Sequence, residues 1–304
     1  MQTLFSILGI YLFIAVGFSA KYFFKEKIDD RTITLLSVYF LQIFLTFWGL
    51  LKRPIDTQLI FVPSLYVAIS VISLLLMIPL AKAIFSNSKE RSIATVAALI
   101  GNTGNLGIPL GIALYGEESI PYTTLINLAN VFIVYTLGVF YYSRGEFSVK
   151  NSLLNIVKLP VLWAALVAIF LNLLGYTPSK AVDNVLMMGA YSSITIQLIL
   201  FGIYLYTIER NTINWKLSYW ISGTKFIFIP LLALFIISLT TLSPIVKGIL
   251  FLQFLVPLAV ANINLASLYN CEPKTVTMNV FITSVIFLLI AVILPQILSK
   301  TVLF

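Results

Sequence analysis

The sequence has no histidine and a single cysteine, Cys271, among its 304 residues. Without histidine the chain lacks a common metal ligand and the side chain that titrates near neutral pH. One cysteine excludes a disulfide within the chain. We therefore expect no metal site and no cofactor. No serine or cysteine has an evident base beside it, so we also expect no catalytic residues and no enzymatic activity.

Charge is scarce as well. Charged residues make up 10% of the chain and hydrophobic residues 60%, whereas a soluble domain carries about 25% charged residues. So few charges cannot cover a soluble surface, but they suffice where lipid covers most of it. The 19 basic residues outnumber the 11 acidic ones. They lie between apolar runs, as in membrane proteins, so we expect a lipid bilayer as partner and no nucleic acid.

Ten apolar runs approach or exceed the roughly 20 residues that a transmembrane helix needs. They are Leu4–Phe23, Thr32–Leu51, Leu59–Ile84, Ser92–Tyr115, Tyr122–Tyr142, Leu154–Leu174, Val182–Tyr206, Tyr219–Leu239, Ile245–Tyr269 and Val276–Leu298. No basic residue precedes the first run, which predicts a retained helix and not a cleaved signal. The fold class is therefore an all-α membrane protein of ten spans.

The basic residues predict the orientation. Loops after the odd-numbered spans hold 13 of them and the opposite side holds five, with Lys225 inside a span. Because cytoplasmic loops are enriched in lysine and arginine, both termini are predicted to lie outside. We expect a multi-pass protein of the plasma membrane.

The two halves of the chain repeat each other. Spans one and six start 150 residues apart, as do spans two and seven, and Pro109 and Pro257 are 148 apart. Since five spans is an odd number, the second copy must be inserted upside down. We predict one five-helix repeat over residues 1–147 and an inverted one over 148–304. Inverted repeats with interrupted helices are typical of secondary transporters.

The fourth span is predicted to be broken. Its stretch Gly101–Pro109 contains three glycines, two asparagines and a proline, which is poor material for a continuous helix. Unwound backbone at membrane depth occurs only where it is buried in protein or lines a wet cavity. Tight helix packing could explain the glycines alone, but the polar residues between them favour a binding site. Its candidate residues are Asn102, Thr103, Gly104, Asn105 and Pro109.

The ninth span supplies the matching break at Pro257, followed by Asn262 and Asn264. Being two apart, the two asparagines cannot both face one cavity on a regular helix. If the two breaks cross near the midplane, two half-helix starts converge, each with free N–H groups and a partial positive charge. Such a crossing can bind an anion.

Two further polar residues are candidates for substrate binding. Lys225 lies about six residues into span eight, where its stem could snorkel to the interface or its ammonium could bind substrate. Asn130 shares a helix face with Asn127 in span five. Interhelical hydrogen bonding and lining of the cavity both remain open for this pair.

No aspartate or glutamate falls in the middle of a predicted span. Proton- and sodium-coupled carriers usually keep a carboxylate within the membrane, so a dedicated acidic relay is not expected. The membrane potential alone favours anion efflux by about 2.3 kcal/mol per charge per 100 mV.

The stretch NTGNLGIPLGIALYG, Asn102 to Gly116, and Pro257 with the later Ala266 and Tyr269–Asn270 resemble the auxin efflux carrier family, which includes plant PIN proteins and bacterial organic-acid permeases. The resemblance covers the whole chain. It implies two inverted repeats whose spans one, two, six and seven form a scaffold, often dimeric, while spans three to five and eight to ten form a mobile unit. It also implies that Asn102 contacts the substrate carboxylate.

The predicted function is therefore secondary or potential-driven transport of a small organic anion by an elevator motion, most simply efflux. Only Ser143 to Leu153 separates the halves, so the chain lacks the large loop of the plant proteins, and malate- or malonate-like acids fit better than auxin. The alternatives are a sodium- or proton-coupled carrier of the bile-acid-symporter type and an anion channel.

Overall fold

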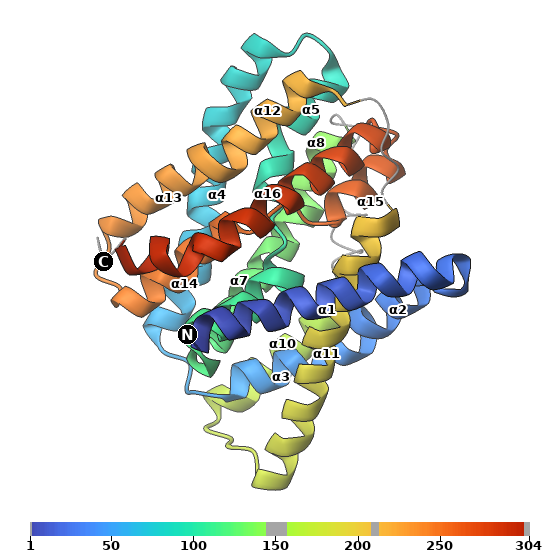
Figure 1. The fold of residues 1–304 in the computed structure, drawn as a ribbon. Helices are drawn as coiled ribbons and strands as arrows, with labels where there is room; N and C mark the ends of the chain where they lie inside the picture. The colour runs from blue at the N-terminus through green and yellow to red at the C-terminus, as the bar shows by residue number, and fades with distance from the viewer. Residues whose placement is uncertain (1, 144–156, 208–212, 301–304) are drawn as a thin grey trace. The chain divides into compact units, whose positions relative to one another are not determined.

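The computed structural model describes residues 2–143, 157–207 and 213–300, and within these ranges the protein is all-helical with no strand (Figure 1). In the first half the helices are α1 (Gln2–Phe24), η1 (Lys25–Lys27), α2 (Asp30–Leu36), η2 (Ser37–Leu41), α3 (Gln42–Leu51), α4 (Thr57–Ile84), α5 (Ser88–Val96), η3 (Ala97–Leu99), η4 (Thr103–Gly107), α6 (Ile108–Tyr115), η5 (Glu117–Ser119), α7 (Ile120–Ile133), η6 (Val134–Gly138) and α8 (Val139–Tyr142).

In the second half they are α10 (Pro160–Leu173), α11 (Lys180–Thr207), α12 (Trp215–Gly223), η7 (Thr224–Phe228), α13 (Ile229–Ser238), α14 (Pro244–Leu255), α15 (Ala261–Leu268) and α16 (Pro273–Lys300). The all-α prediction is confirmed for the described residues. The predicted boundary between the repeats, at residues 147 and 148, lies outside them.

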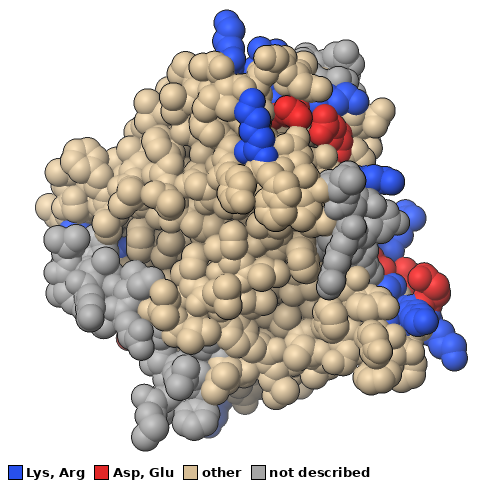
Figure 2. Space-filling view, turned by 45° about the horizontal axis from the view of Figure 1, so that its top comes forward, with Lys and Arg blue, Asp and Glu red and all other residues tan. Residues whose placement is uncertain are grey.

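Seven helical stretches of the described chain are long and apolar enough to cross a membrane, and α10 and α14 are shorter apolar helices. Many large apolar side chains on them are exposed, among them Leu166, Phe170 and Leu289. Figure 2 shows a broad area without charged side chains, with lysines, arginines and acids toward its edges. Lipid can cover such a surface, whereas water would not favour it. The multi-pass membrane prediction holds, while the count of ten spans stays a prediction.

The chain folds into two compact units. Unit 1 comprises the described parts of Met1–Phe61, Gly104–Leu125 and Val157–Thr207, and unit 2 those of Val62–Thr103, Ile126–Ile156 and Ile208–Phe304. Each unit draws on both halves of the sequence. The chain passes from unit 2 to unit 1 between Thr103 and Gly104, inside the predicted fourth span.

Unit 1 is organised around a close crossing of α1 and α11. A Cβ built on Gly17 would lie 1.9 Å from the carbonyl oxygen of Ile199, and one built on Gly202 would lie 1.9 Å from that of Ile14. No side chain fits at either place. Small residues allow membrane helices to approach this closely, which gives van der Waals contact where lipid offers no hydrophobic driving force.

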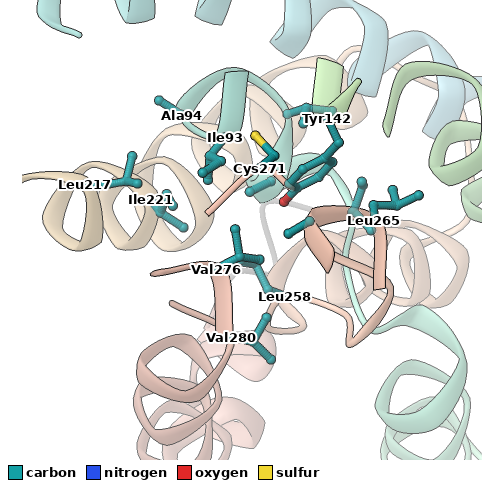
Figure 3. Packing of buried hydrophobic residues seen from close by; sticks show 14 of the residues in the cluster. Ile93, Ala94, Tyr142, Leu217, Ile221, Leu258, Leu265, Cys271, Val276 and Val280 are labelled. Atoms are coloured by element: carbon teal, nitrogen blue, oxygen red, sulfur yellow. The ribbon is translucent and has the colours of Figure 1, made fainter. Parts of the chain in front are cut away.

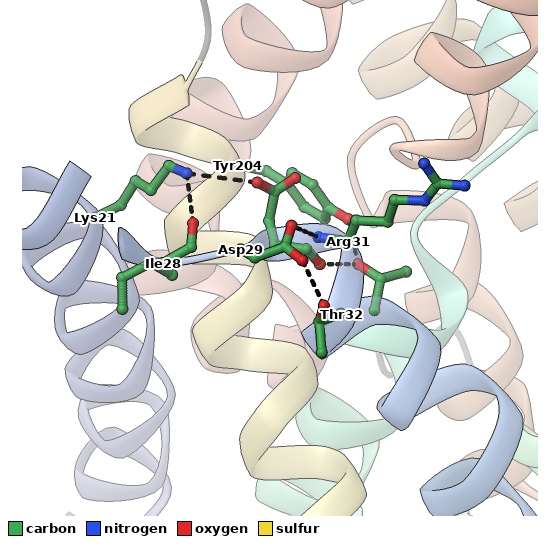
Figure 4. A network of polar contacts seen from close by, with 8 residues as sticks. Lys21, Ile28, Asp29, Arg31, Thr32 and Tyr204 are labelled. Atoms are coloured by element: carbon green, nitrogen blue, oxygen red, sulfur yellow. Dashed lines mark hydrogen bonds and ion pairs between the residues drawn. The ribbon is translucent and has the colours of Figure 1, made fainter. Parts of the chain in front are cut away.

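The turn from α1 to α2 in unit 1 is held by polar contacts (Figure 4). Lys21 Nζ donates to the Ile28 carbonyl at 2.7 Å. Asp29 caps α2, since its carboxylate accepts from the backbone N–H of Arg31 at 3.2 Å and from the Thr32 hydroxyl. The Thr32 hydrogen bond is the main reason that the pKa of the Asp29 carboxyl is lowered, and the backbone N–H of Arg31 contributes further. The charged cap suits the positive end of the helix.

Unit 2 has an apolar core where α5, α8, α12 and α16 meet (Figure 3). Its members include Ile93, Tyr142, Leu217, Cys271 and Val276. The Tyr142 ring is fully buried there. This core fixes one end of the segments that carry the polar site.

We predict that Gly17→Ala destabilises the protein, because the new methyl group would collide with the backbone of α11. Overpacking of this kind costs about 1–3 kcal/mol, although alanine is the better helix former. The measurement is the midpoint of thermal unfolding in detergent.

Gly9→Ala, in the same helix, is the matched control, because nothing lies within 4 Å of its added Cβ. Its midpoint should equal or exceed that of the wild type. Equal midpoints for the two variants would contradict the close crossing.

Candidate functional site

Two helical interruptions of unit 2 meet in the structure. After α5 and η3 the chain leaves the helical conformation until η4 begins at Thr103, and after α14 it does so until α15 begins. Gly101 in the first interruption and Leu258 in the second form an isolated antiparallel β-bridge. We call the segments Ile100–Asn102 and Val256–Val260 the crossover.

The crossover satisfies backbone groups that the interrupted helices leave without partners. The N–H of Asn102 donates to the carbonyl of Pro257 at 2.8 Å, and the N–H of Ala259 donates to the carbonyl of Ile100 at 2.9 Å. Val256 is extended, with ψ of 148°, as the residue before a proline prefers. Pro257 therefore ends α14, and the hydrogen bonds between the two segments replace the lost helical ones.

Asn130, on α7, holds the first interruption from one side. Its Nδ2 donates to the carbonyl of Gly101 at 2.9 Å. Its Oδ1 accepts from the hydroxyl of Tyr66, on α4, at 3.2 Å. Both side chains are buried, and the Tyr66 ring stacks on Phe254 of α14 at 4.7 Å between centroids.

Asn262, on α15, makes the equivalent contact from the second interruption. Its Nδ2 donates to the carbonyl of Ile100 at 3.0 Å and to that of Ala259 at 3.1 Å. Its Oδ1 accepts from the hydroxyl of Tyr142 at 2.9 Å. The crossover is thus held by two relays, each running from a buried tyrosine through an asparagine to a backbone carbonyl.

Asn102 differs from these two asparagines. Its side chain is 4% exposed, and its Nδ2 has no hydrogen-bond partner in the described chain. The neighbouring Thr103 is satisfied, because its hydroxyl donates to Asn127 Oδ1 at 2.9 Å. A buried amide donor without a partner is rare in proteins and asks for an explanation.

Lys225 reaches the crossover from η7, a π-helical turn between α12 and α13. The side chain is 2% exposed. Its Nζ donates to the carbonyl of Ala98 at 3.2 Å and lies 3.0 Å from the position that a Cβ on Gly101 would occupy. The absence of a side chain on Gly101 therefore makes room for the ammonium, and the described residues place no carboxylate in an ion pair with it.

The other predicted residues lie elsewhere. Asn264 is exposed on α15. Gly104 and Asn105, on η4, are half-buried, and Pro109 is buried on α6; all three belong to unit 1. There Pro109 lines a cavity of about 260 Å³, together with Gly9, Ile10, Phe13, Ile112, Ala113, Tyr191, Ile194, Thr195 and Leu198.

Sequence reasoning missed Tyr66, Tyr142 and the carbonyl of Ala98. The chain has 15 tyrosines, and nothing in their spacing distinguishes these two from residues that pack or face lipid. The described residues contain no group of three or more cysteine, aspartate or glutamate side chains that could hold a metal ion.

Several apolar membrane-spanning helices, with a polar crossover inside one unit, define the class as a multi-pass membrane transporter. The sequence model of the family described as "Membrane transport protein" matches the chain twice, over residues 3–152 and 146–295. The chain belongs to this family, which is that of the auxin efflux carriers, and it is a transporter and not an enzyme.

The chain is also similar to a protein of Methanocaldococcus jannaschii that is named as an uncharacterized transporter. The two are 25% identical over 294 residues, which cover 93% of this chain and 95% of the other.

We predict that Tyr66→Phe and Tyr142→Phe each destabilise the protein, because each leaves a buried asparagine oxygen without its donor. An unsatisfied buried acceptor costs about 1–3 kcal/mol. Thermal unfolding in detergent measures the effect. Tyr219→Phe is the matched control, since the Tyr219 side chain is 71% exposed. If all three variants had the same midpoint of thermal unfolding, the two relays would contribute nothing to stability.

Proposed function

We propose that this protein is a carrier of a small organic anion, such as a carboxylate or an auxin-like acid, in the plasma membrane. Binding takes place at the crossover, and the anion moves by alternating access. Efflux is the natural direction in a cell, because the interior is negative and each charge leaving gains about 2.3 kcal/mol per 100 mV.

The observations that carry this proposal are two donors that meet the crossover at the neighbouring positions 101 and 102. The Nδ2 of Asn102 has no hydrogen-bond partner among the described residues, and the ammonium of Lys225 lies against the adjacent Gly101. Both groups donate hydrogen bonds and neither accepts one, so a ligand that satisfies them must bring acceptors. A carboxylate brings two oxygens and a negative charge, which suits an ammonium and an amide donor.

The fold around the crossover supports transport of this anion. We propose ten spans in two inverted repeats, both termini outside, with the interrupted helices crossing near the midplane. Unit 1 would act as the scaffold and unit 2 as the mobile element of an elevator, with a homodimer formed through the scaffold helices. Membership of the family supports this arrangement, since carriers of this kind bind substrate at paired helix breaks.

The remaining predicted residues keep a role in this proposal. Thr103 follows Asn102 directly, and Pro257 ends α14. Gly104, Asn105 and Pro109 belong to unit 1 and stay predicted contacts; Pro109 lies in the first turn of α6 and not at the interruption. Asn264 stays a predicted contact on the exposed side of α15. A different coupling ion or a channel mechanism would use the same residues, so the test must resolve the type of flux.

The test is transport in liposomes that contain the purified protein. Uptake of labelled malate, malonate and indole-3-acetate is measured with and without an imposed inside-positive potential. Saturable uptake of one acid, counterflow against unlabelled acid and stimulation by the potential are expected. Flux without saturation or counterflow would indicate a channel, and no uptake of any acid would overturn the organic-anion assignment.

We predict that Asn102→Ala raises the KM for the transported acid about tenfold or more, because a hydrogen bond to a charged group contributes about 1.5–3 kcal/mol. Thermal stability should be unchanged, since the Nδ2 removed has no partner in the described protein. Asn184→Ala, at an exposed position of α11, is the matched control. An Asn102→Ala protein with wild-type KM would place the substrate elsewhere.

A further inference from the structure

We infer that Lys225 carries a proton together with the anion, so that transport is anion–proton symport. The inference rests on the proposed function and specifies its coupling. The amine of Lys225 takes up one proton as the anion binds and forms an ion pair with it. Both leave together on the other side, and the lysine returns as a neutral amine.

The geometry gives the ammonium one partner. Lys225 is 2% exposed, and its Nζ has the Ala98 carbonyl at 3.2 Å as its hydrogen-bond acceptor within the described residues. A charged lysine has three N–H donors. A buried ammonium with so little compensation is strongly disfavoured unless a negative charge joins it.

The elements that pack most extensively against η7 are α12, α13, α14 and η3, and none of their described residues is an acid. Their charged or titratable side chains are Lys216, Tyr219 and Lys247. Lys216 donates to the carbonyl of Ile84, and Tyr219 is 71% exposed. Lys247, on α14, is cationic and cannot compensate a second cation.

Two acids of unit 2, Glu90 and Glu272, lie among the described residues. Glu90 accepts a hydrogen bond from Asn214 at 2.8 Å. Glu272 precedes α16 in a turn with φ of 47°. The ion pairs of the described residues, Lys21–Asp30, Lys52–Glu117 and Arg53–Asp56, all lie in unit 1. No ion pair of the described residues includes Lys225, and we assign its counter-charge to the transported anion.

The charge balance follows directly. With one proton per anion, a monocarboxylate crosses without net charge, and a dicarboxylate crosses with one negative charge. The effect of potential in the proposed function therefore remains for malate and malonate, while a pH difference becomes a second driving force. Because Lys225 would carry the proton, proton coupling would not need an acidic residue within the spans.

The experiment uses the full-length protein in liposomes, with the potential clamped at zero by potassium and valinomycin. Malonate uptake is measured with the outside more acidic by one pH unit, and a pH-sensitive dye inside reports proton entry. For the wild type we expect malonate to accumulate above equilibration by up to tenfold, since one pH unit is a factor of ten in proton concentration. Protein-free liposomes give the background.

Lys225→Met should lose both the acceleration by the pH difference and the proton signal. Lys82→Met, at an exposed lysine in the last turn of α4, is the matched control and should keep both. If Lys225→Met responded to pH as the wild type does, the proton would travel on the substrate and the inference would be wrong. Wild-type counterflow with no response to pH would overturn it too, while the proposed function would stand.

Gly101→Ala gives a test that leaves the lysine in place. The added methyl would lie 3.0 Å from Nζ and 3.2 Å from a methyl carbon of Val256, so the ammonium must shift by a few tenths of an ångström from its place beside residue 101. We expect a several-fold higher KM for malonate and a weaker pH response. Unchanged values in a stably folded Gly101→Ala protein would contradict the assigned position of the ion pair.

Discussion

The arrangement of unit 2 depends on one constraint, which is that backbone N–H and C=O groups need partners where water is absent. Two interrupted helices would leave several such groups bare. Pairing of Gly101 with Leu258 resolves this, because the two backbone hydrogen bonds beside the bridge join one interruption to the other. Neither interruption would be tolerable alone. The crossover is therefore a structural requirement, independent of the binding role that we propose for it.

The two tyrosine–asparagine relays extend the same logic. The carbonyl oxygen of Gly101 accepts a hydrogen bond from the Nδ2 of Asn130. The carbonyl oxygen of Ile100 accepts two, one from the backbone N–H of Ala259 and one from the Nδ2 of Asn262. Each asparagine is in turn held by a buried hydroxyl, so its amide has one favourable orientation. Rigid support of this kind favours binding of a small ion, because donors that are already held in place need not be ordered when the ion binds, and that ordering would cost free energy.

The sequence predicts where the two interruptions lie better than it predicts which residues contact one another there. Glycines, asparagines and a proline in Gly101–Pro109, with Pro257 in the second half, predict interruptions, because these residues are poor helix formers. In the structure the first interruption covers only residues 100–102, and the chain is helical again from Thr103 through Pro109. The fold class and family follow from hydropathy and these motifs. Which of Asn262 and Asn264 points inward depends on where α15 begins, which the structure places at Ala261. Partners distant in the chain, such as Tyr66 for Asn130, leave no trace in a single sequence.

Asn102 and Lys225 stand apart because they violate the rule that the rest of the crossover obeys. Asn130 and Asn262 each have a partner for the amide donor, and packing could have replaced Asn102 and Lys225 at a gain in stability. An unpartnered donor and a buried cation next to one glycine are unfavourable in the empty protein and favourable around an anion. In the proposed symport the same burial makes the charge on Lys225 conditional on that anion. Binding and proton uptake would then be one event, and the driving force for transport would follow from where a single lysine is buried.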